Sequence, residues 1–155
     1  MVVPVIRLTR DAYFANLVQG VAMRGSCVRR KTGCILVDQH YHIIGTGYNG
    51  RPRGFVECLN EPCQGAYAAS GTALEQCEAI HSEINALIQC KNTEEIMVAY
   101  CTTAPCIHCV KALLNTSCKR IAFLDDYPHS EVSRKLCETA KVNWHHLPPA
   151  MSKAL

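Results

Sequence analysis

Hydrophobic residues along this chain follow helical spacing in some stretches and strand-like spacing in others. Between Thr9 and about Met23 the apolar residues recur at intervals of three and four, which predicts an amphipathic helix with Thr9 as its N-cap. Two β-branched apolar runs, residues 33–37 and 41–46, flank Asp38-Gln39-His40 and predict a hairpin. The chain therefore opens with a helix followed by two paired strands.

The second half of the chain alternates between helix and strand. We expect a helix that begins at Leu74 or Cys77 and ends near Cys90, with a buried stripe formed by Ile80, Ile84, Leu87 and Ile88. The later predicted elements are a strand at 95–102, a helix at 107–115, a strand at 119–124, a helix at 130–140 capped by Ser130, and a strand at 142–147. This order predicts an α/β fold with three layers, α/β/α, on a mixed five-stranded sheet.

The connection between the hairpin and the second helix is unusually long. Residues 51–72 are rich in glycine, proline and small residues and show no sustained period, so we expect a long loop. The length of 155 residues suits a single domain, 1–155, with one core and a short tail at 148–155. No apolar run is long enough to cross a membrane, and Met1–Ile6 is too short for a signal peptide.

Composition and charge narrow the class of protein. A hydrophobic content of 48% with 19% charged residues is typical of a soluble globular domain. Eleven cysteines without a secretory signal favour the reducing cytoplasm, with thiols free or bound to metal. The net charge of +3 is too small to indicate a polynucleotide partner. Basic residues do cluster, at 29–31 and at Arg51 and Arg53, where they could bind a phosphate or simply face solvent.

A histidine, a carboxylate and a pair of cysteines carry the candidate chemistry. Cys106 and Cys109 follow Pro105, which suits a helix start, and their spacing puts both sulfurs on one side of the first turn. Together with His81 they offer zinc one imidazole and two thiolates, which leaves the fourth position for a water whose pKa the metal lowers. Glu83 diverges from His81 at the exposed start of its helix, so it can act as the general acid and base.

Each part of this pattern has a simpler interpretation when taken alone. A lone Cys-x-x-Cys often marks structural zinc or a redox site, and a lone His-x-Glu has no meaning. The order of the parts, the proline and the gap between them favour a catalytic centre. The other histidines, His108, His145 and His146, are expected at the surface or at a sheet edge.

The same residues carry a resemblance to a known family. The segments His81–Leu87 and Pro105–Cys109 contain the H-x-E and P-C-x-x-C pattern of zinc nucleobase deaminases. With Gly47–Gly50 (Gly-Tyr-Asn-Gly), they resemble deoxycytidylate (dCMP) deaminases over about residues 13–147, although Ser82 stands where alanine is usual. The resemblance implies the cytidine deaminase-like fold and zinc-dependent hydrolysis of dCMP to dUMP, with dCTP as a further candidate substrate.

The resemblance also implies roles for residues around the metal. Arg29 would lie near the substrate phosphate, Asn49 would hold the sugar, and Tyr127 would close over the pyrimidine or its phosphate. The backbone N–H of Ser82 would meet O2 of cytosine, and the carbonyl of Ala104 would receive the exocyclic amine. Without the resemblance, the Asn-Gly pair is a turn signal and the tyrosine is a lone loop aromatic.

A second metal site is a further expectation from the resemblance, because family members often carry a structural zinc near the long loop. Cys58, Cys63 and Cys77 could supply three ligands, with Cys27 as the fourth. Buried free thiols are the alternative.

Regulation and assembly are likewise implied only by the family. Its dCMP deaminases are commonly hexamers that dCTP activates and dTTP inhibits, with Mg²⁺ bound to the nucleotide. Tyr48, Gly50 and Arg51 lie where such an effector site is expected.

Two other functions compete with dCMP deamination. A tRNA adenosine deaminase, or another polynucleotide deaminase, would need a broad basic face that a net charge of +3 does not supply. A non-catalytic binding module stabilised by zinc would have no use for the unligated carboxylate of Glu83. The sequence therefore favours an enzyme acting on a small deoxynucleotide.

Overall fold

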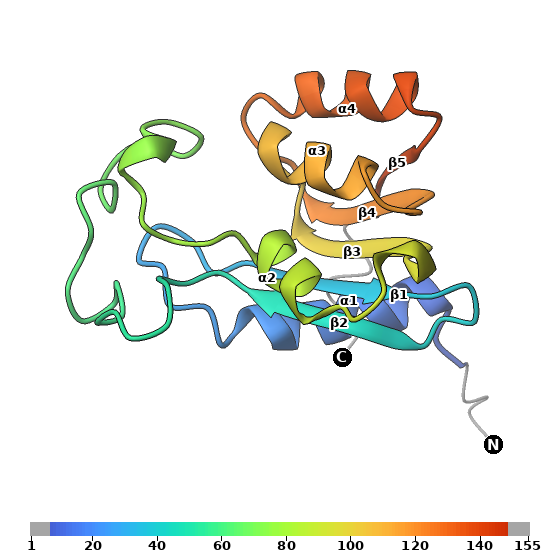
Figure 1. The fold of residues 1–155 in the computed structure, drawn as a ribbon, viewed down its shortest axis with the longest axis horizontal. Coiled ribbons are helices and arrows are strands. Elements are labelled where there is room, and N and C mark those ends of the chain that lie inside the picture. The colour runs from blue at the N-terminus through green and yellow to red at the C-terminus, as the bar shows by residue number, and fades with distance from the viewer. Residues whose placement is uncertain (1–6, 149–155) are drawn as a thin grey trace, which may run out of the picture.

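The computed structural model describes residues 7–148, which form one sheet with helices on both faces (Figure 1). The elements are α1 (Arg10–Ala22), β1 (Gly33–Val37), β2 (Ile43–Tyr48), the 3₁₀ turn η1 (Leu74–Gln76), α2 (Ser82–Gln89), the 3₁₀ turn η2 (Thr93–Glu95), β3 (Val98–Thr103), α3 (Ile107–Leu114), β4 (Arg120–Asp125), α4 (Ser130–Thr139) and β5 (Asn143–His146). The apolar opening run Met1–Ile6 and the expected tail after Pro148 lie outside the described residues.

The sheet has five strands in the order β2-β1-β3-β4-β5. Strand β1 is antiparallel to both β2 and β3, whereas β4 is parallel to both β3 and β5. The sheet is therefore mixed, as the sequence predicts. None of the helices within residues 7–148 has the length and hydrophobicity that a bilayer-spanning helix needs.

Two apolar clusters fill the spaces between the layers. Because side chains alternate along a strand, Cys34 and Leu36 of β1 face one cluster while Ile35 faces the other. The first cluster contains buried residues of α2, α3 and α4, and the second contains Phe14 and Val18 of α1. Helix α1 thus covers one face and the other helices cover the opposite face, which confirms the three-layer prediction.

Strand starts are where the sequence prediction is least accurate. Strand β2 begins at Ile43 rather than at Tyr41, because residues 38–42 form a turn in which the Asp38 carboxylate accepts hydrogen bonds from the backbone N–H groups of His40 and His42. Tyr41 has φ +63° within this turn. Strand β3 begins at Val98 rather than at residue 95, because η2 precedes it.

The second helix begins later than predicted. Helix α2 starts at Ser82, because η1 ends at Gln76 and a β-bridge between Gly50 and Ile80 holds the next residues extended. The predicted buried stripe is wrong at Ile88, whose side chain is 71% exposed, and the fully buried apolar residue of this helix is Ala86. The predicted cap at Ser130 is also wrong.

At the start of α4 the cap position belongs to the preceding residue. His129 is the N-cap, with φ +68°, and it makes no side-chain capping hydrogen bond. Ser130 is the first helical residue. A serine beside the first helical turn is an N-cap signal in sequence, but only the backbone conformation decides which residue takes that position.

The predicted long loop is present, since residues 51–73 contain neither helix nor strand. Arg51 holds its first half in place. The guanidinium donates to the carbonyls of Val56 and Glu61 and forms an ion pair with Glu78. One side chain therefore ties two points of the loop to Glu78, which follows the loop.

A hydrogen-bonded ion pair joins α1 to β4, and a further hydrogen bond joins it to β3. Arg120 donates two hydrogen bonds of 2.8 Å to the Asp11 carboxylate, and the Tyr100 hydroxyl donates a third of 2.7 Å. The hydrogen bond from Arg120, which outweighs the effect of partial burial, lowers the pKa of the Asp11 carboxyl. The folded state therefore favours the ionised form of Asp11.

Replacing this carboxylate should weaken the fold. We expect Asp11→Asn to lower the free energy of unfolding at pH 7 by about 1–2 kcal/mol, measured by urea denaturation, because charged hydrogen bonds are lost. Since the folded pKa lies below the unfolded one, the difference from wild type should shrink as pH falls below about 4. The exposed Glu131, paired with Arg134, provides the control. Glu131→Gln should cost under about 0.5 kcal/mol, and equal losses would contradict the assignment.

Candidate metal centre

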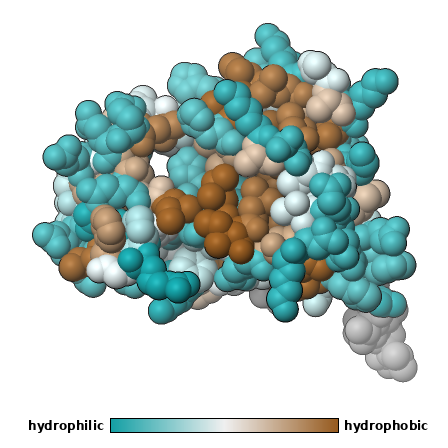
Figure 2. Space-filling model, in the orientation of Figure 1, coloured by the Kyte–Doolittle hydropathy of each residue, from teal (hydrophilic) through white to brown (hydrophobic). Residues whose placement is uncertain are grey.

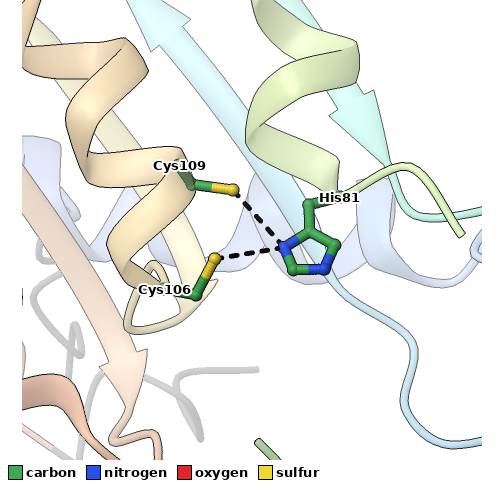
Figure 3. Close-up of side chains that lie close together, drawn as sticks. All are labelled: His81, Cys106 and Cys109. Carbon is green, nitrogen blue, oxygen red and sulfur yellow. Dashed lines mark hydrogen bonds between the residues drawn. The ribbon is translucent and has the colours of Figure 1, made fainter. Parts of the chain in front are cut away.

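Three side chains from two separate helix starts converge on one point (Figure 3). His81 Nδ1 lies 3.4 Å from the sulfur of Cys106 and 3.4 Å from the sulfur of Cys109. Zinc–sulfur and zinc–nitrogen bonds of about 2.3 and 2.0–2.1 Å in a tetrahedron require nitrogen–sulfur distances of roughly 3.5 Å. The separation and the donor set therefore fit zinc.

Local structure explains why these residues meet. His81 is the N-cap of α2 and Cys106 is the N-cap of α3, so both helices point their N-termini at the same place. Cys109 lies in the first turn of α3, on the same side as Cys106. Pro105 comes one residue before the cap. Helix N-termini favour negative charge, so this arrangement stabilises thiolates.

The protonation of the three groups is coupled. A hydrogen bond from the Cys109 thiol, followed by the contact with His81, lowers the pKa of the Cys106 thiol to about 3. The same bond to Cys106, together with burial, raises the pKa of Cys109, and the contact with Cys106 raises the pKa of His81. The cluster thus retains protons that metal binding would release.

Glu83 lies beside this cluster without belonging to it. The prediction that the helix start exposes Glu83 is wrong, because only 6% of the residue is exposed. It lies on the inner side of the first turn of α2, where burial raises the pKa of its carboxyl. Among residues 7–148, the only group of three candidate ligand atoms within 4.8 Å of one another is that of His81, Cys106 and Cys109. Glu83 is therefore a carboxylate that lies beside the three candidate ligands but does not belong to their group.

A pocket of about 330 Å³ opens over the cluster. His81, Glu83 and Cys106 line it, together with four residues to which the sequence analysis gave substrate roles: Arg29, Asn49, Ala104 and Tyr127. Ser82 does not line the pocket and is buried behind Glu83. The predicted effector residues, Tyr48, Gly50 and Arg51, also lie outside the lining.

Two of the predicted substrate residues already have protein partners. Asn49 is buried, and its amide accepts a hydrogen bond from the Thr32 N–H and donates one to the Arg30 carbonyl. Arg29 donates to the carbonyls of Ala69, at 2.6 Å, and Thr72, at 3.2 Å. Arg29 therefore holds the far part of the long loop against the pocket.

That part of the loop lines one side of the pocket, which the sequence did not predict. Residues between Ala66 and Leu74 line the pocket, including the exposed Tyr67. Arg30 and Thr103 also line it, and Arg30 donates to the Thr103 hydroxyl at 3.4 Å. The basic run at residues 29–31 was the available signal for Arg30. No local signal marks the loop residues.

The long loop also gathers cysteines. The sulfurs of Cys58 and Cys63 lie 3.9 Å apart in a small buried cluster, and Cys77 packs against it. Backbone N–H groups of Glu78 and Gly65 outweigh the effect of burial and lower the pKa of Cys63. Cys27 is buried and lines the pocket beside Cys77. These four sulfurs do not include three within 4.8 Å of one another.

Comparison with known proteins agrees with this geometry. The family model described as "Cytidine and deoxycytidylate deaminase zinc-binding region" matches residues 8–125. This chain belongs to the cytidine and deoxycytidylate deaminase family. Family membership confirms the resemblance, and the match to a zinc-binding region agrees with zinc as the metal that the ligand set fits.

Among the relatives within the deaminase family are enzymes of yeast and of a phage. The deoxycytidylate deaminase of Saccharomyces cerevisiae is 30% identical over 141 residues, which are 90% of this chain and 45% of the relative. The deoxycytidylate deaminase of Mycobacterium phage D29 is 31% identical over 119 residues, 73% of this chain and 92% of the relative. The chain thus spans about half the length of the yeast relatives it matches.

A solved structure agrees with the fold of the deaminase family. The dCMP deaminase of cyanophage S-TIM5, in complex with dCMP and dUMP, superimposes with a TM-score of 0.71 at 21% identity. The match covers 91% of this chain and all of the phage protein. It confirms the predicted cytidine deaminase-like fold.

Proposed function

We propose that this chain catalyses the hydrolytic deamination of dCMP to dUMP. The carrying observation is the buried, unligated carboxylate of Glu83 beside a three-ligand metal site in an open pocket. A structural zinc site is closed by four protein ligands, whereas a catalytic one keeps a position for water. The names of the relatives, deoxycytidylate deaminases from yeast and phage, supply the substrate.

The proposed chemistry divides between the metal and the protein. Zinc held by His81, Cys106 and Cys109 would make water a nucleophile at neutral pH. Glu83 takes one proton from the attacking water and delivers it to N3 of cytosine, and it then carries the second proton of that water from the new C4 hydroxyl to the amino group, which departs as ammonia. A carboxylate that lines the pocket and is only 6% exposed is suited to these transfers, because burial reduces the competition of bulk water for its hydrogen bonds.

Backbone groups would recognise the cytosine base. The N–H of Ser82 would donate to O2, and the carbonyl of Ala104 would accept the exocyclic amine. Ala104 lines the pocket at the end of β3, and Ser82 opens α2. Asn49, fixed by its own hydrogen bonds, would meet the sugar, and Tyr127 would cover the ring.

The 5′-phosphate would lie against the arginines of the pocket, with Arg29 as the proposed contact. We expect Arg29→Ala to lower kcat/KM for dCMP by about 10²-fold and that for deoxycytidine much less, because a charged hydrogen bond is worth about 1.5–3 kcal/mol. Ammonia release at several substrate concentrations measures both. Arg53→Ala, in the exposed part of the loop, is the control. Equal losses on the two substrates would instead indicate that Arg29 acts only by holding the loop.

A substrate panel tests the proposed function directly. Ammonia release should be fastest with dCMP among cytosine, deoxycytidine, dCMP, dCTP and RNA containing adenosine. Preference for dCTP would move the substrate to the triphosphate. Product from RNA alone would support a polynucleotide deaminase, and no product from any substrate would support a non-catalytic binding module.

We further propose a second, structural zinc held by Cys27, Cys58, Cys63 and Cys77. The gathering of three of these cysteines in a buried cluster supports it, as does the N–H bonding that lowers the pKa of Cys63. Such a site would fix a loop that lacks regular structure.

We also propose how this chain assembles and how it is regulated. Hydrophobic side chains gather at the centre of the face in Figure 2, where Figure 1 shows α2. Ile88 of this helix is 71% exposed. Such a patch supports a homo-oligomer, with a hexamer as the proposed form, in the cytoplasm. Light scattering should give a mass well above 17.1 kDa.

Activation by dCTP, and inhibition by dTTP with Mg²⁺ near Tyr48 and Gly50, should appear in the ammonia-release assay.

A further inference from the structure

A serine hydroxyl contacts the proposed proton-transfer group. Ser82 Oγ donates a hydrogen bond of 3.1 Å to Oε2 of Glu83. Both residues are buried, with 2% of Ser82 and 6% of Glu83 exposed. This is the one side-chain hydrogen bond of Ser82 within residues 7–148.

The hydroxyl has no structural task at the helix start. His81, and not Ser82, is the N-cap of α2, and the helix has no side-chain capping bond. Ser82 is the first helical residue, so its hydroxyl does not satisfy an unpaired backbone N–H of the first turn. Its hydrogen bond is therefore directed at the carboxylate alone.

The backbone that carries this hydroxyl is tightly held. A Cβ added at Gly47 of β2 would lie 2.2 Å from the Ser82 carbonyl oxygen and 2.3 Å from the Ala86 nitrogen. Only glycine permits this approach, which presses α2 onto the sheet. Ser82 thus presents its donor from a fixed position.

The carboxylate, by contrast, has a freedom that needs to be restricted. The last torsion of a glutamate side chain is broad, so burial alone does not fix the plane of the carboxylate. A hydrogen bond to Oε2 restricts that torsion and leaves Oε1 directed elsewhere. Proton transfer depends strongly on such alignment.

We propose that the Ser82 hydroxyl is a positioning group that orients the Glu83 carboxylate, so that Oε1 meets the reacting water and substrate. The inference rests on the proposed deaminase function. It assigns a side-chain role to Ser82, separate from the contact of its backbone N–H with the base. Ser82 acts through Glu83 and exchanges no proton with the substrate.

The test compares three replacements at this position. Ser82→Ala should lower kcat about tenfold, which corresponds to about 1.4 kcal/mol of activation free energy, with KM unchanged. Ser82→Thr, which keeps the hydroxyl, should stay near the wild-type kcat. Ser82→Cys, similar in size to serine but a weak donor, should behave like the alanine variant.

Two readouts without turnover separate positioning from a structural effect. Zinc content, and the dissociation constant for the product dUMP measured by calorimetry, should be the same in wild type and Ser82→Ala. A fall in both would show that the serine serves only the structure of the site. If the methyl group of Ser82→Thr reduces zinc content, the comparison of the cysteine and alanine variants with wild type decides.

The outcomes also separate this inference from the proposed function. Wild-type turnover of dCMP with an unchanged or raised kcat in Ser82→Ala would overturn the positioning role and leave the deaminase intact. Absence of turnover in wild type would overturn both. A lower kcat in the alanine and cysteine variants, with zinc and dUMP binding unchanged, would support the inference.

Discussion

Glu83→Gln is expected to lower the turnover of dCMP by about 10³- to 10⁴-fold while the protein keeps its zinc. Glutamine has nearly the same shape as glutamate, so the buried packing at the start of α2 should survive. It cannot accept and return a proton, however, so every transfer assigned to Glu83 would fail. Ammonia release gives the rate, and metal analysis of the purified variant gives the zinc content.

The same pair of measurements can contradict the assignment. Loss of zinc in Glu83→Gln would identify Glu83 as a ligand, and retention of most activity would place proton transfer elsewhere. Glu94 provides a matched control, because it is an exposed glutamate on η2 and lines neither of the cavities that border His81. Glu94→Gln should change neither rate nor zinc content.

The clustering of His81, Cys106 and Cys109 could be predicted in part from sequence, because the position of each side chain depends on local structure. The positions of Cys106 and Cys109 relative to one another follow from one helical turn, and His81 and Glu83 are two residues apart at another helix start. Local structure does not determine whether the two segments meet in the fold. That expectation came from the family resemblance. The structure brings them together at the ends of α2 and α3 that face the pocket.

The features that could not be predicted depend on contacts between distant residues. Helix α2 starts late because Ile80 pairs with Gly50, 30 positions earlier, and no periodicity within the helix encodes that bridge. Arg29 binds carbonyls 40 and 43 residues away, so its hold on the long loop is invisible in sequence. Glu83 is buried in the pocket that Arg29 and residues of the long loop also line. A helical wheel alone would expose it.

The order of the elements, by contrast, was predictable. Buried runs such as Gly33–Val37 read as strands because every residue is apolar or small, and α1 reads as a helix because its apolar residues share one side. The exposed Ile88 shows the limit of that reasoning. The spacing of the apolar residues indicates which of them can be buried. It does not tell whether this chain or a second copy of it buries them.

The largest combined effect on metal content and activity is expected from replacing a sulfur of the catalytic cluster. Cys109→Ser should remove one zinc per chain and lower dCMP turnover by at least about 10³-fold, because the activated water is lost with the metal. Cys63→Ser should remove the other proposed zinc and lower the melting temperature while leaving most turnover. Metal analysis, the ammonia assay and thermal melting of each variant measure these effects.

These two variants make the two proposed metal sites separately testable. Wild type should contain two zincs per chain, and each serine variant should contain one, with activity following only the cluster of Cys109. A single zinc in wild type that Cys63→Ser does not change would reduce the loop cluster to buried free thiols. Cys90→Ser is the control, since Cys90 bonds the Asn92 carbonyl and belongs to neither cluster. If Cys109→Ser kept both zinc and turnover of dCMP, the metal would not need Cys109, and the assignment of Cys109 as a ligand of the catalytic zinc would be wrong.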